Sequence, residues 1–218
     1  MFQGASPFAD FVDSTFLVIV GISLLVLIGL LITMVTFIVR YSRAKNPHPS
    51  NIEGNVPLEI LWTVIPLALF MGMFYLGWKG YVTTIDVPEN PLPITVTARM
   101  WSWTFEYPNG VKTDTLYVPL AVPVKLALHS LDVNHSLYIP AFRIKKDVIP
   151  NRVNTMWFKT SAVASYDIAC AEYCGLRHSY MYTKVVSKDS TDFDNWYREE
   201  SQKQSKPYQS LLSVAVPK

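Results

Sequence analysis

Residues 16–39 form a long apolar run that contains no charged residue. About 20 consecutive apolar residues are enough to cross the hydrocarbon core of a bilayer as a helix. A cleavable signal peptide is the competing interpretation, but such a peptide has a basic start and a shorter apolar core. Here the preceding residues are acidic, with Asp10 and Asp13. The run therefore predicts a true membrane span.

A second apolar run covers residues 60–78 and contains Pro66. Membrane helices tolerate a proline where neighbouring groups satisfy the freed backbone carbonyl. We therefore expect residues 1–82 to form a transmembrane hairpin whose two spans are these apolar runs.

The segment between the two runs is basic, because it carries Arg40, Arg43 and Lys45. Short basic loops stay on the cytoplasmic side of a membrane. The rest of the chain after residue 82 is then expected outside, in the periplasm of a bacterial plasma membrane or on the equivalent side of a mitochondrial inner membrane.

The pattern changes after a proline-rich linker at residues 83–92. In residues 93–190, short stretches of alternating apolar and polar residues are separated by Pro, Asn, Asp and Ser turns, as in ITVTARMWSWTFEY. About a hundred residues of this kind predict an all-β Greek-key sandwich or barrel. Residues 191–218 are more polar at first and are expected to form a tail with a short surface helix, loosely held beyond Lys206.

Four side chains that bind metals fall within twelve residues: Cys170, Cys174, His178 and Met181. A further histidine, His135, lies upstream. Thiolates and thioethers are soft ligands that favour copper, whereas imidazole suits copper or zinc. The cluster therefore indicates a metal or redox site.

Three interpretations of the two cysteines compete. A disulfide leaves His178 and Met181 unexplained, and a Cys2His2 zinc site leaves the methionine without a role. A mononuclear copper site needs one cysteine, two histidines and a weak methionine ligand. The second cysteine adds a thiolate, which allows two sulfurs to bridge two coppers, so copper accounts for every residue of the cluster.

The loop CAEYCGLRHSYM resembles the C-x-E-x-C-x-x-x-H-x-x-M signature of the binuclear CuA centre in the cytochrome c oxidase subunit II family. DVNHSLYIP, KKDVIPNR, MWSWTFEYPNG and PLEILWTVIP resemble other stretches of that family. The resemblance runs from the first span to about residue 190, and it implies a cupredoxin-like fold for residues 93–190. Asn151 departs from the family, which has glycine there, but asparagine tolerates a left-handed backbone better than most residues.

The resemblance also implies a role for each member of the cluster. His135 and His178 each bind one copper ion, and Cys170 and Cys174 bridge the two. Met181 supplies a thioether. A sixth ligand is the backbone carbonyl of Glu172, whose side chain points towards a magnesium ion shared with the catalytic subunit.

Several other residues match family positions with weaker support. Trp101 corresponds to the exposed tryptophan through which electrons reach the copper, whereas Trp103 is expected in the core. Glu59 matches a glutamate at the mouth of a proton channel, although an interfacial charge is the alternative. Asp147 and Arg152 match residues that face the catalytic subunit, and a plain surface ion pair between them is the alternative.

The expected function is that of subunit II of a membrane cytochrome c oxidase. Its partners are then oxidase subunit I, further oxidase subunits, the bilayer, and cytochrome c or a membrane-held cytochrome c donor. The chain lacks histidine-bearing spans for haem, so it is not expected to reduce oxygen or pump protons alone. The alternatives are a CuA subunit of a nitric oxide reductase and a stand-alone membrane cupredoxin. Binding to nucleic acid is not expected, because the net charge is only +2 and no Lys/Arg-rich run is present.

The charge balance bears on the electron donor. Residues 83–218 contain 15 Lys and Arg against 13 Asp and Glu, so the exported part is not acidic. Asp114 and Glu106, near the aromatic segment, are the candidates for a local acidic patch. The balance predicts a donor less cationic than mitochondrial cytochrome c or one held in a supercomplex, with a weak salt dependence of turnover.

Overall fold

The computed structural model describes residues 5–48, 50 and 53–214, with side chains as far as Gln204. The chain divides into two compact units. One is Val12–Tyr81, and the other combines the N-terminal residues up to Phe11 with the chain from Val82 onward.

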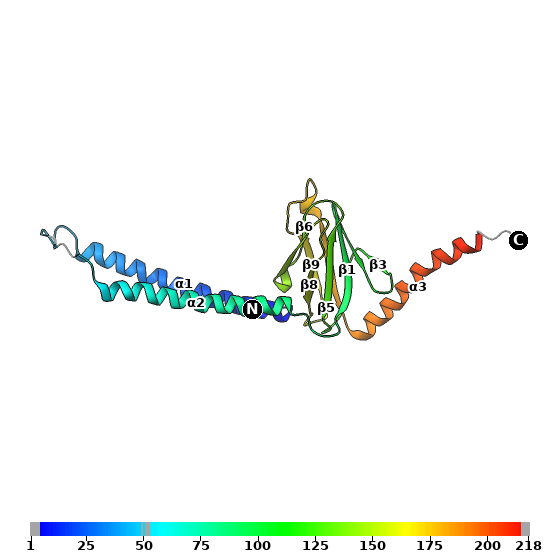
Figure 1. Cartoon of the computed structure of the whole chain (residues 1–218), viewed down its shortest axis with the longest axis horizontal. Helices are drawn as coiled ribbons and strands as arrows, with labels where there is room; N and C mark the ends of the chain where they lie inside the picture. Colours follow the sequence, from blue (N-terminus) through cyan, green and yellow to red (C-terminus); the bar gives the residue numbers. More distant parts are fainter. Residues whose placement is uncertain (1–4, 49, 51–52, 215–218) are drawn as a thin grey trace. The chain divides into compact units, whose positions relative to one another are not determined.

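Two long helices, α1 (Pro7–Arg40) and α2 (Val56–Ile85), contain the two apolar runs (Figure 1). Both are long and apolar enough to cross a membrane, and most of their large apolar side chains are exposed. The hydroxyls of Thr33, Thr36 and Thr63 donate to backbone carbonyls one turn earlier in the same helix. The helices thus satisfy these polar groups internally, as an apolar solvent requires.

The chain from residue 92 forms two five-stranded sheets. The first has the order β3-β2-β1-β5-β8 and the second the order β4-β10-β9-β6-β7. The first contains β1 (Leu92–Arg99), β2 (Ser102–Glu106), β3 (Lys112–Thr113), β5 (Val124–Ser130) and β8 (Asn154–Phe158). The second contains β4 (Leu116–Pro119), β6 (His135–Ile139), β7 (Ile144–Val148), β9 (Ser165–Cys170) and β10 (Tyr182–Lys188).

Most neighbouring strands are antiparallel, but β1 pairs with β5, and β4 with β10, in parallel. Two short 3-10 helices, η1 (Pro140–Phe142) and η2 (His178–Tyr180), interrupt the chain between strands. The parallel pairs require crossovers between the sheets, which excludes a simple meander of hairpins. The all-β domain expected from the alternating pattern is confirmed.

The core between the sheets follows from the two-residue period of a strand, which directs alternate side chains to one face. In β1, Ile94, Val96 and Ala98 are buried while the residues between them are more exposed. The other strands contribute in the same way, and one cluster joins both sheets; its members include Phe105, Leu116, Leu126, Leu137, Phe158, Ile168 and Val185.

The N-terminal segment packs on the β domain, which the sequence did not suggest. Ser161 donates its backbone N–H to the carbonyl of Ala5 at 3.1 Å. The rings of Phe8 and Trp157 meet edge to face with centroids 4.8 Å apart, and Ser6 is fully buried. The N-terminal residues in these contacts precede the first apolar run, so no periodic pattern predicted the contacts.

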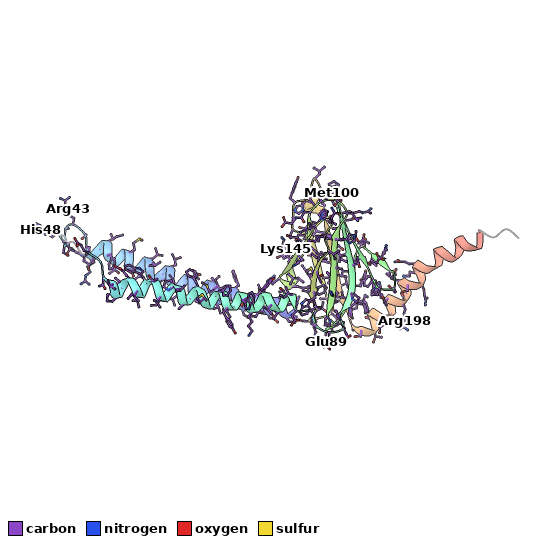
Figure 2. The ribbon with its side chains drawn as sticks, viewed as in Figure 1. Arg43, His48, Glu89, Met100, Lys145 and Arg198 are labelled. Atoms are coloured by element: carbon purple, nitrogen blue, oxygen red, sulfur yellow. The ribbon has the colours of Figure 1, made fainter. Side chains whose placement is uncertain are left out.

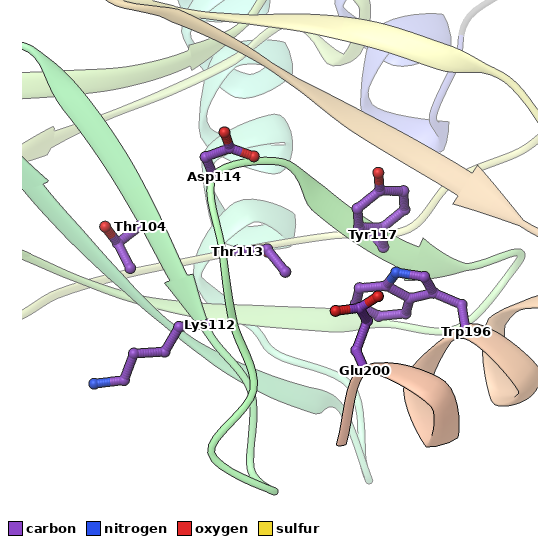
Figure 3. A pocket seen from close by; sticks show the side chains of 7 residues that line it. All are labelled: Thr104, Lys112, Thr113, Asp114, Tyr117, Trp196 and Glu200. Atoms are coloured by element: carbon purple, nitrogen blue, oxygen red, sulfur yellow. The ribbon is translucent and has the colours of Figure 1, made fainter. Parts of the chain in front are cut away.

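The C-terminal helix α3 (Ser190–Val214) is longer than the short helix expected for the tail, and residues 215–218 lie outside the described part. Trp196 stacks near the Tyr117 ring with centroids 4.5 Å apart, and Gln204 exchanges two hydrogen bonds of 3.0 Å with the backbone of Lys112. A pocket remains between α3 and the chain at β3 and β4, where Glu200 lies near Trp196 and Tyr117 (Figure 3). The helix thereby covers β3, a two-residue edge strand that has few pairing partners of its own.

Phe158→Ala tests the core. Phe158 is fully buried and its ring centroid lies 5.1 Å from that of Phe142. Removing the ring leaves a cavity, so we expect the β domain to lose about 3–5 kcal/mol of stability. Chemical unfolding of the full chain in detergent, followed by near-UV circular dichroism, measures the change. Val163→Ala at an exposed position is the control, and equal losses in the two variants would contradict the assigned core.

Candidate metal centre

The strand pairing brings His135 to the cysteine loop. His135 is the first residue of β6, and Cys170 is the last residue of β9. These strands are antiparallel neighbours, with Leu137 opposite Cys170. After β9 the chain loops through η2, which carries His178, and returns at β10 just after Met181. All of the predicted ligands therefore meet at one end of the second sheet.

Cys170 has one imidazole and one carbonyl beside its sulfur. Its Sγ lies 3.8 Å from Nδ1 of His135 and 3.3 Å from the backbone oxygen of Glu172. The Sγ atoms of Cys170 and Cys174 are 3.8 Å apart. The first half of the cluster therefore offers a soft sulfur, a nitrogen and a weak oxygen donor.

Cys174 has a corresponding set of neighbours. Its Sγ lies 3.5 Å from Nδ1 of His178 and 3.8 Å from Sδ of Met181. Met181 is buried while His178 is partly exposed. Each sulfur therefore has one imidazole and one weak donor of its own, and the two sulfurs lie next to each other at the centre of the cluster.

The two cysteines are free thiols, because a disulfide bond would hold the sulfurs about 2.05 Å apart. Burial raises the pKa of the Cys174 thiol to about 12, and the neighbouring Cys170 adds to the shift. A buried thiol with a raised pKa resists ionisation unless a cation lies beside it. The sulfurs of both cysteines and one ring nitrogen of His135 all lie within 4.8 Å of one another, so a metal ion fits here.

The donor set decides which metal suits the cluster. A structural zinc site closes with four ligands and would leave the Met181 thioether unused. Two thiols, two imidazoles, a thioether and a carbonyl match the preferences of copper. The residues therefore fit the copper that the sequence pattern implied.

Asp132 orients His135, although sequence reasoning assigned Asp132 no role. Its Oδ1 lies 2.8 Å from Nε2 of His135, which leaves Nδ1 directed at Cys170. Desolvation alone favours the protonated carboxyl, but hydrogen bonds from the Met100 N–H and from His135 outweigh it and lower the pKa of Asp132. A carboxylate behind a ligating histidine fixes its ring and raises its basicity.

Both tryptophans of the aromatic segment reach the metal loop. Trp101, in the turn between β1 and β2, donates from Nε1 to the Cys174 carbonyl at 3.2 Å and is partly exposed. Trp103 is buried in the core and donates to the Met181 carbonyl at 3.4 Å. Gly175 has a φ of +111°, and a Cβ there would lie 3.5 Å from the Trp101 indole. A glycine therefore relieves the backbone where the loop meets the ring.

Glu172 is paired within the chain. Its Oε1 lies 2.7 Å from Nζ of Lys145, which also lies 3.0 Å from Asp147 (Figure 2 labels Lys145). The Glu172 hydrogen bond is the largest cause of a raised pKa of Lys145, and Lys145 in turn lowers the pKa of Asp147. Asp147 therefore pairs with Lys145, and not with Arg152 as the surface-pair interpretation held. Arg152 is exposed and lines a pocket together with Lys145 and Asp147.

Glu59 has a local structural partner. Its Oε1 accepts a hydrogen bond from the N–H of Asn55 at 3.3 Å, while Asn55 Oδ1 accepts one from Leu58 at 3.2 Å. These contacts cap the N-terminus of α2, where backbone donors lack partners within the helix. A proton-channel role for Glu59 stays a prediction.

The two acidic residues proposed for a donor patch each lie near lysine. Glu106 forms an ion pair of 3.1 Å with Lys112. Asp114 lines one pocket with Lys112, as Figure 3 shows, and another with Lys184. The donor-docking role of Asp114 and Glu106 stays a prediction.

Comparison with protein families gives a consistent result over both units. A family model for the periplasmic domain of cytochrome c oxidase subunit II matches residues 110–188, and one for its transmembrane domain matches residues 1–75. The chain belongs to the cytochrome c oxidase subunit II family. It is accordingly an integral membrane protein.

Individual relatives have the same family name. The cytochrome c oxidase subunit 2 of Alkalihalophilus pseudofirmus is 29% identical over 89% of this chain and 60% of that protein. That of Thermostichus vulcanus is 26% identical over 90% of this chain and 77% of that protein. The chain therefore spans about two thirds of the length of these relatives.

Among solved structures, the chain is similar to a periplasmic domain of the same family. The crystal structure of the periplasmic domain of subunit II from Bradyrhizobium japonicum superposes with a TM-score of 0.52 at 26% identity, covering 54% of this chain and 99% of that domain. The expected transmembrane hairpin followed by a cupredoxin-like domain is confirmed.

Asp132→Ala tests the orientation of His135. Without the carboxylate the imidazole can rotate away, so we expect affinity for copper to fall about 10- to 100-fold. Chelator competition on the purified full chain measures the affinity. Asp167→Ala, which removes an exposed carboxylate from β9, is the control. Equal affinities in the Asp132 variant and the parent would contradict the orienting role.

Proposed function

We propose that this chain is the electron-accepting subunit of a cytochrome c oxidase and that its six-donor cluster binds two copper ions as a CuA centre. Support comes from the matched surroundings of the two sulfurs, since each thiol has its own imidazole and its own weak donor. When bound there, the two coppers would supply a site that takes up and gives up one electron with little change in geometry. This matched arrangement is the observation that carries the proposal.

The protein residues hold that site and connect it to the surface. His135 and His178 direct Nδ1 at the sulfurs, and Asp132 holds one of these rings in place. Trp101 bridges the surface and the loop, because its indole is partly exposed and donates to the Cys174 carbonyl. Electrons from a cytochrome c, free or membrane-held, therefore have a short covalent and hydrogen-bonded route inward through Trp101.

Delivery to the haem–copper subunit I is proposed from the other flank of the loop. Glu172, Lys145 and Asp147 lie together there, and Arg152 lines the adjoining pocket. A magnesium ion shared with subunit I would take the Glu172 carboxylate that Lys145 holds here. Subunit I would then reduce oxygen and pump protons, with further oxidase subunits completing the complex.

The proposed orientation follows from the basic loop between α1 and α2. Arg40, Arg43 and Lys45 favour the cytoplasmic side, so the β domain would face the periplasm of a bacterial plasma membrane. A mitochondrial inner membrane is the alternative location with the equivalent orientation. A nitric oxide reductase subunit and a stand-alone carrier are not favoured, because the named relatives are oxidase subunits.

Metal analysis and electron spin resonance test the centre. We expect two coppers per chain and, in the oxidised protein, hyperfine splitting from two equivalent nuclei, because the two sulfurs have matching neighbours. Cys174→Ser should abolish this signal, while Met181→Leu should perturb it without emptying the site, since a thioether is a weak ligand. A single copper, or zinc, in the parent protein would contradict the binuclear assignment.

Two substitutions at Glu59 separate proton delivery from helix capping. Glu59→Gln keeps an oxygen that can accept from Asn55 but removes the titrating group, whereas Glu59→Ala removes both. If Glu59 delivers protons to subunit I, both variants should slow oxygen consumption by the purified complex with an unchanged copper spectrum. Normal turnover in the Gln variant and slow turnover in the Ala variant would mean that Glu59 caps helix α2 and does not deliver protons.

A further inference from the structure

The surface beside Trp101 is apolar at its centre. Met100, Leu176 and Tyr182 are 45%, 88% and 63% exposed. The side chains of Trp101 and Met100 lie against the loop at Gly175, the residue before Leu176. A Cβ added to Gly175 would be 3.5 Å from the Trp101 indole and 3.8 Å from Sδ of Met100. Tyr182 lines a pocket together with Trp101. We call Met100, Trp101, Leu176 and Tyr182 the indole patch.

Exposed apolar groups of this size mark a surface that a partner covers. The two charged residues next to the patch in the chain are both arginines, since Arg99 precedes Met100 and Arg177 follows Leu176. Both are exposed, and neither forms an ion pair within the described residues. Arg99 only donates from Nε to the Ser102 hydroxyl at 3.2 Å.

The nearest carboxylate offers little compensation at the surface. Asp132 accepts hydrogen bonds from the N–H groups of Met100 at 2.6 Å and Val133 at 2.7 Å, and it contacts His135 at 2.8 Å. Its oxygens are therefore turned towards donors of the protein. Among the described residues, Asp132 therefore forms no ion pair with Arg99 or Arg177, the two arginines at the rim of the patch.

The other carboxylates on this side of the domain are accompanied by lysines. Glu106 pairs with Lys112, and Asp114 shares a pocket with Lys184. Lys184 also lies opposite Asp167 in the pairing of β10 with β9. Asp114 lines that pocket together with Trp101 and Tyr182 and forms no ion pair among the described residues, but Arg99, Arg177 and Lys184 outnumber it around the patch.

We propose that the indole patch docks an electron-donating haem protein whose docking face is apolar and carries carboxylates opposite Arg99 and Arg177. The inference rests on the proposed function, because it assumes that electrons enter through Trp101. It departs from the docking of a cationic cytochrome c on an acidic surface that family resemblance would suggest. Apolar contact would supply most of the affinity, while the arginines would set the association rate and its dependence on salt.

One haem protein in two charge states tests the proposal. The probes are cytochrome c in its cationic form and the same protein after succinylation of its lysines, which replaces positive charges by carboxylates. Oxidation of each by the purified native complex is measured over a range of ionic strength. We expect the rate with the cationic form to rise with salt, because like charges are screened, and the rate with the succinylated form to fall.

Charge reversal then locates the effect. Arg99→Glu and Arg177→Glu should each speed oxidation of the cationic form and slow that of the succinylated form by about threefold or more at low salt. Lys125→Glu makes the same change in net charge and should leave both rates unchanged. Lys125 is a suitable control because it lies away from the indole patch. It pairs with Pro93 near the start of β1, whereas Arg99 ends that strand. In Figure 2, Met100 lies at the opposite end of the domain from Glu89, which shortly precedes β1.

The outcomes separate this inference from the proposed function. A steep fall in rate with salt for the cationic form, or no effect of reversal at either arginine, overturns the docking inference while the complex remains an oxidase. Loss of the partner subunits from the Arg99 and Arg177 variants would assign the patch to the complex interface and also overturn it. If the parent complex oxidises neither form, or Trp101→Ala accepts electrons normally from both with full copper content, the proposed route itself fails.

Discussion

Two buried thiols 3.8 Å apart impose the main constraint on this domain. Burial and the neighbouring Cys170 raise the pKa of the Cys174 thiol to about 12, so this thiol ionises readily only when a cation compensates its charge. A cation between two sulfurs needs further donors to complete its coordination, and the loop alone brings only some of them. The strand β6 supplies His135 from 35 residues before Cys170 because it pairs with β9. The Greek-key topology is thus what completes the ligand set.

The same loop separates two flanks with different partners in the chain. The first sheet contributes Trp101 from the β1–β2 turn, and the second contributes Lys145 and Asp147 from β7. Trp101 contacts the backbone of Cys174, whereas Lys145 contacts the side chain of Glu172. An electron relay needs an acceptor face and a delivery face that two proteins can occupy together. Under the proposed function the ligand loop provides both, because Trp101 from the first sheet and Lys145 from the second contact different residues of it.

Sequence reasoning succeeded where a short-range pattern carries the information. The apolar runs indicated both long helices, the alternating stretches indicated the β domain, and the spacing of the cysteines, His178 and Met181 indicated the cluster, whose members the structure brings together. It failed where the contact depends on tertiary geometry. The docking of Phe8 on Trp157 and the length of α3 are examples, because neither has a periodic or compositional signal. The pairing of Lys145 with Glu172, 27 residues away, and the cap formed by Glu59 are further cases.

Asp132 shows why a ligand list is easier to predict than its support. The six donors must be sulfur, nitrogen or oxygen atoms of particular kinds, since the chemistry of the metal restricts them. The rim of the indole patch is under no such restriction, because Arg99 and Arg177 are exposed and could change with little effect on the core. Partner choice can therefore change by substitution at the rim while the cluster and its orienting carboxylate stay the same. The positive charge beside Trp101 is a property of the chain's surface and not of the metal site, and for that reason the ligand signature cannot identify the electron donor.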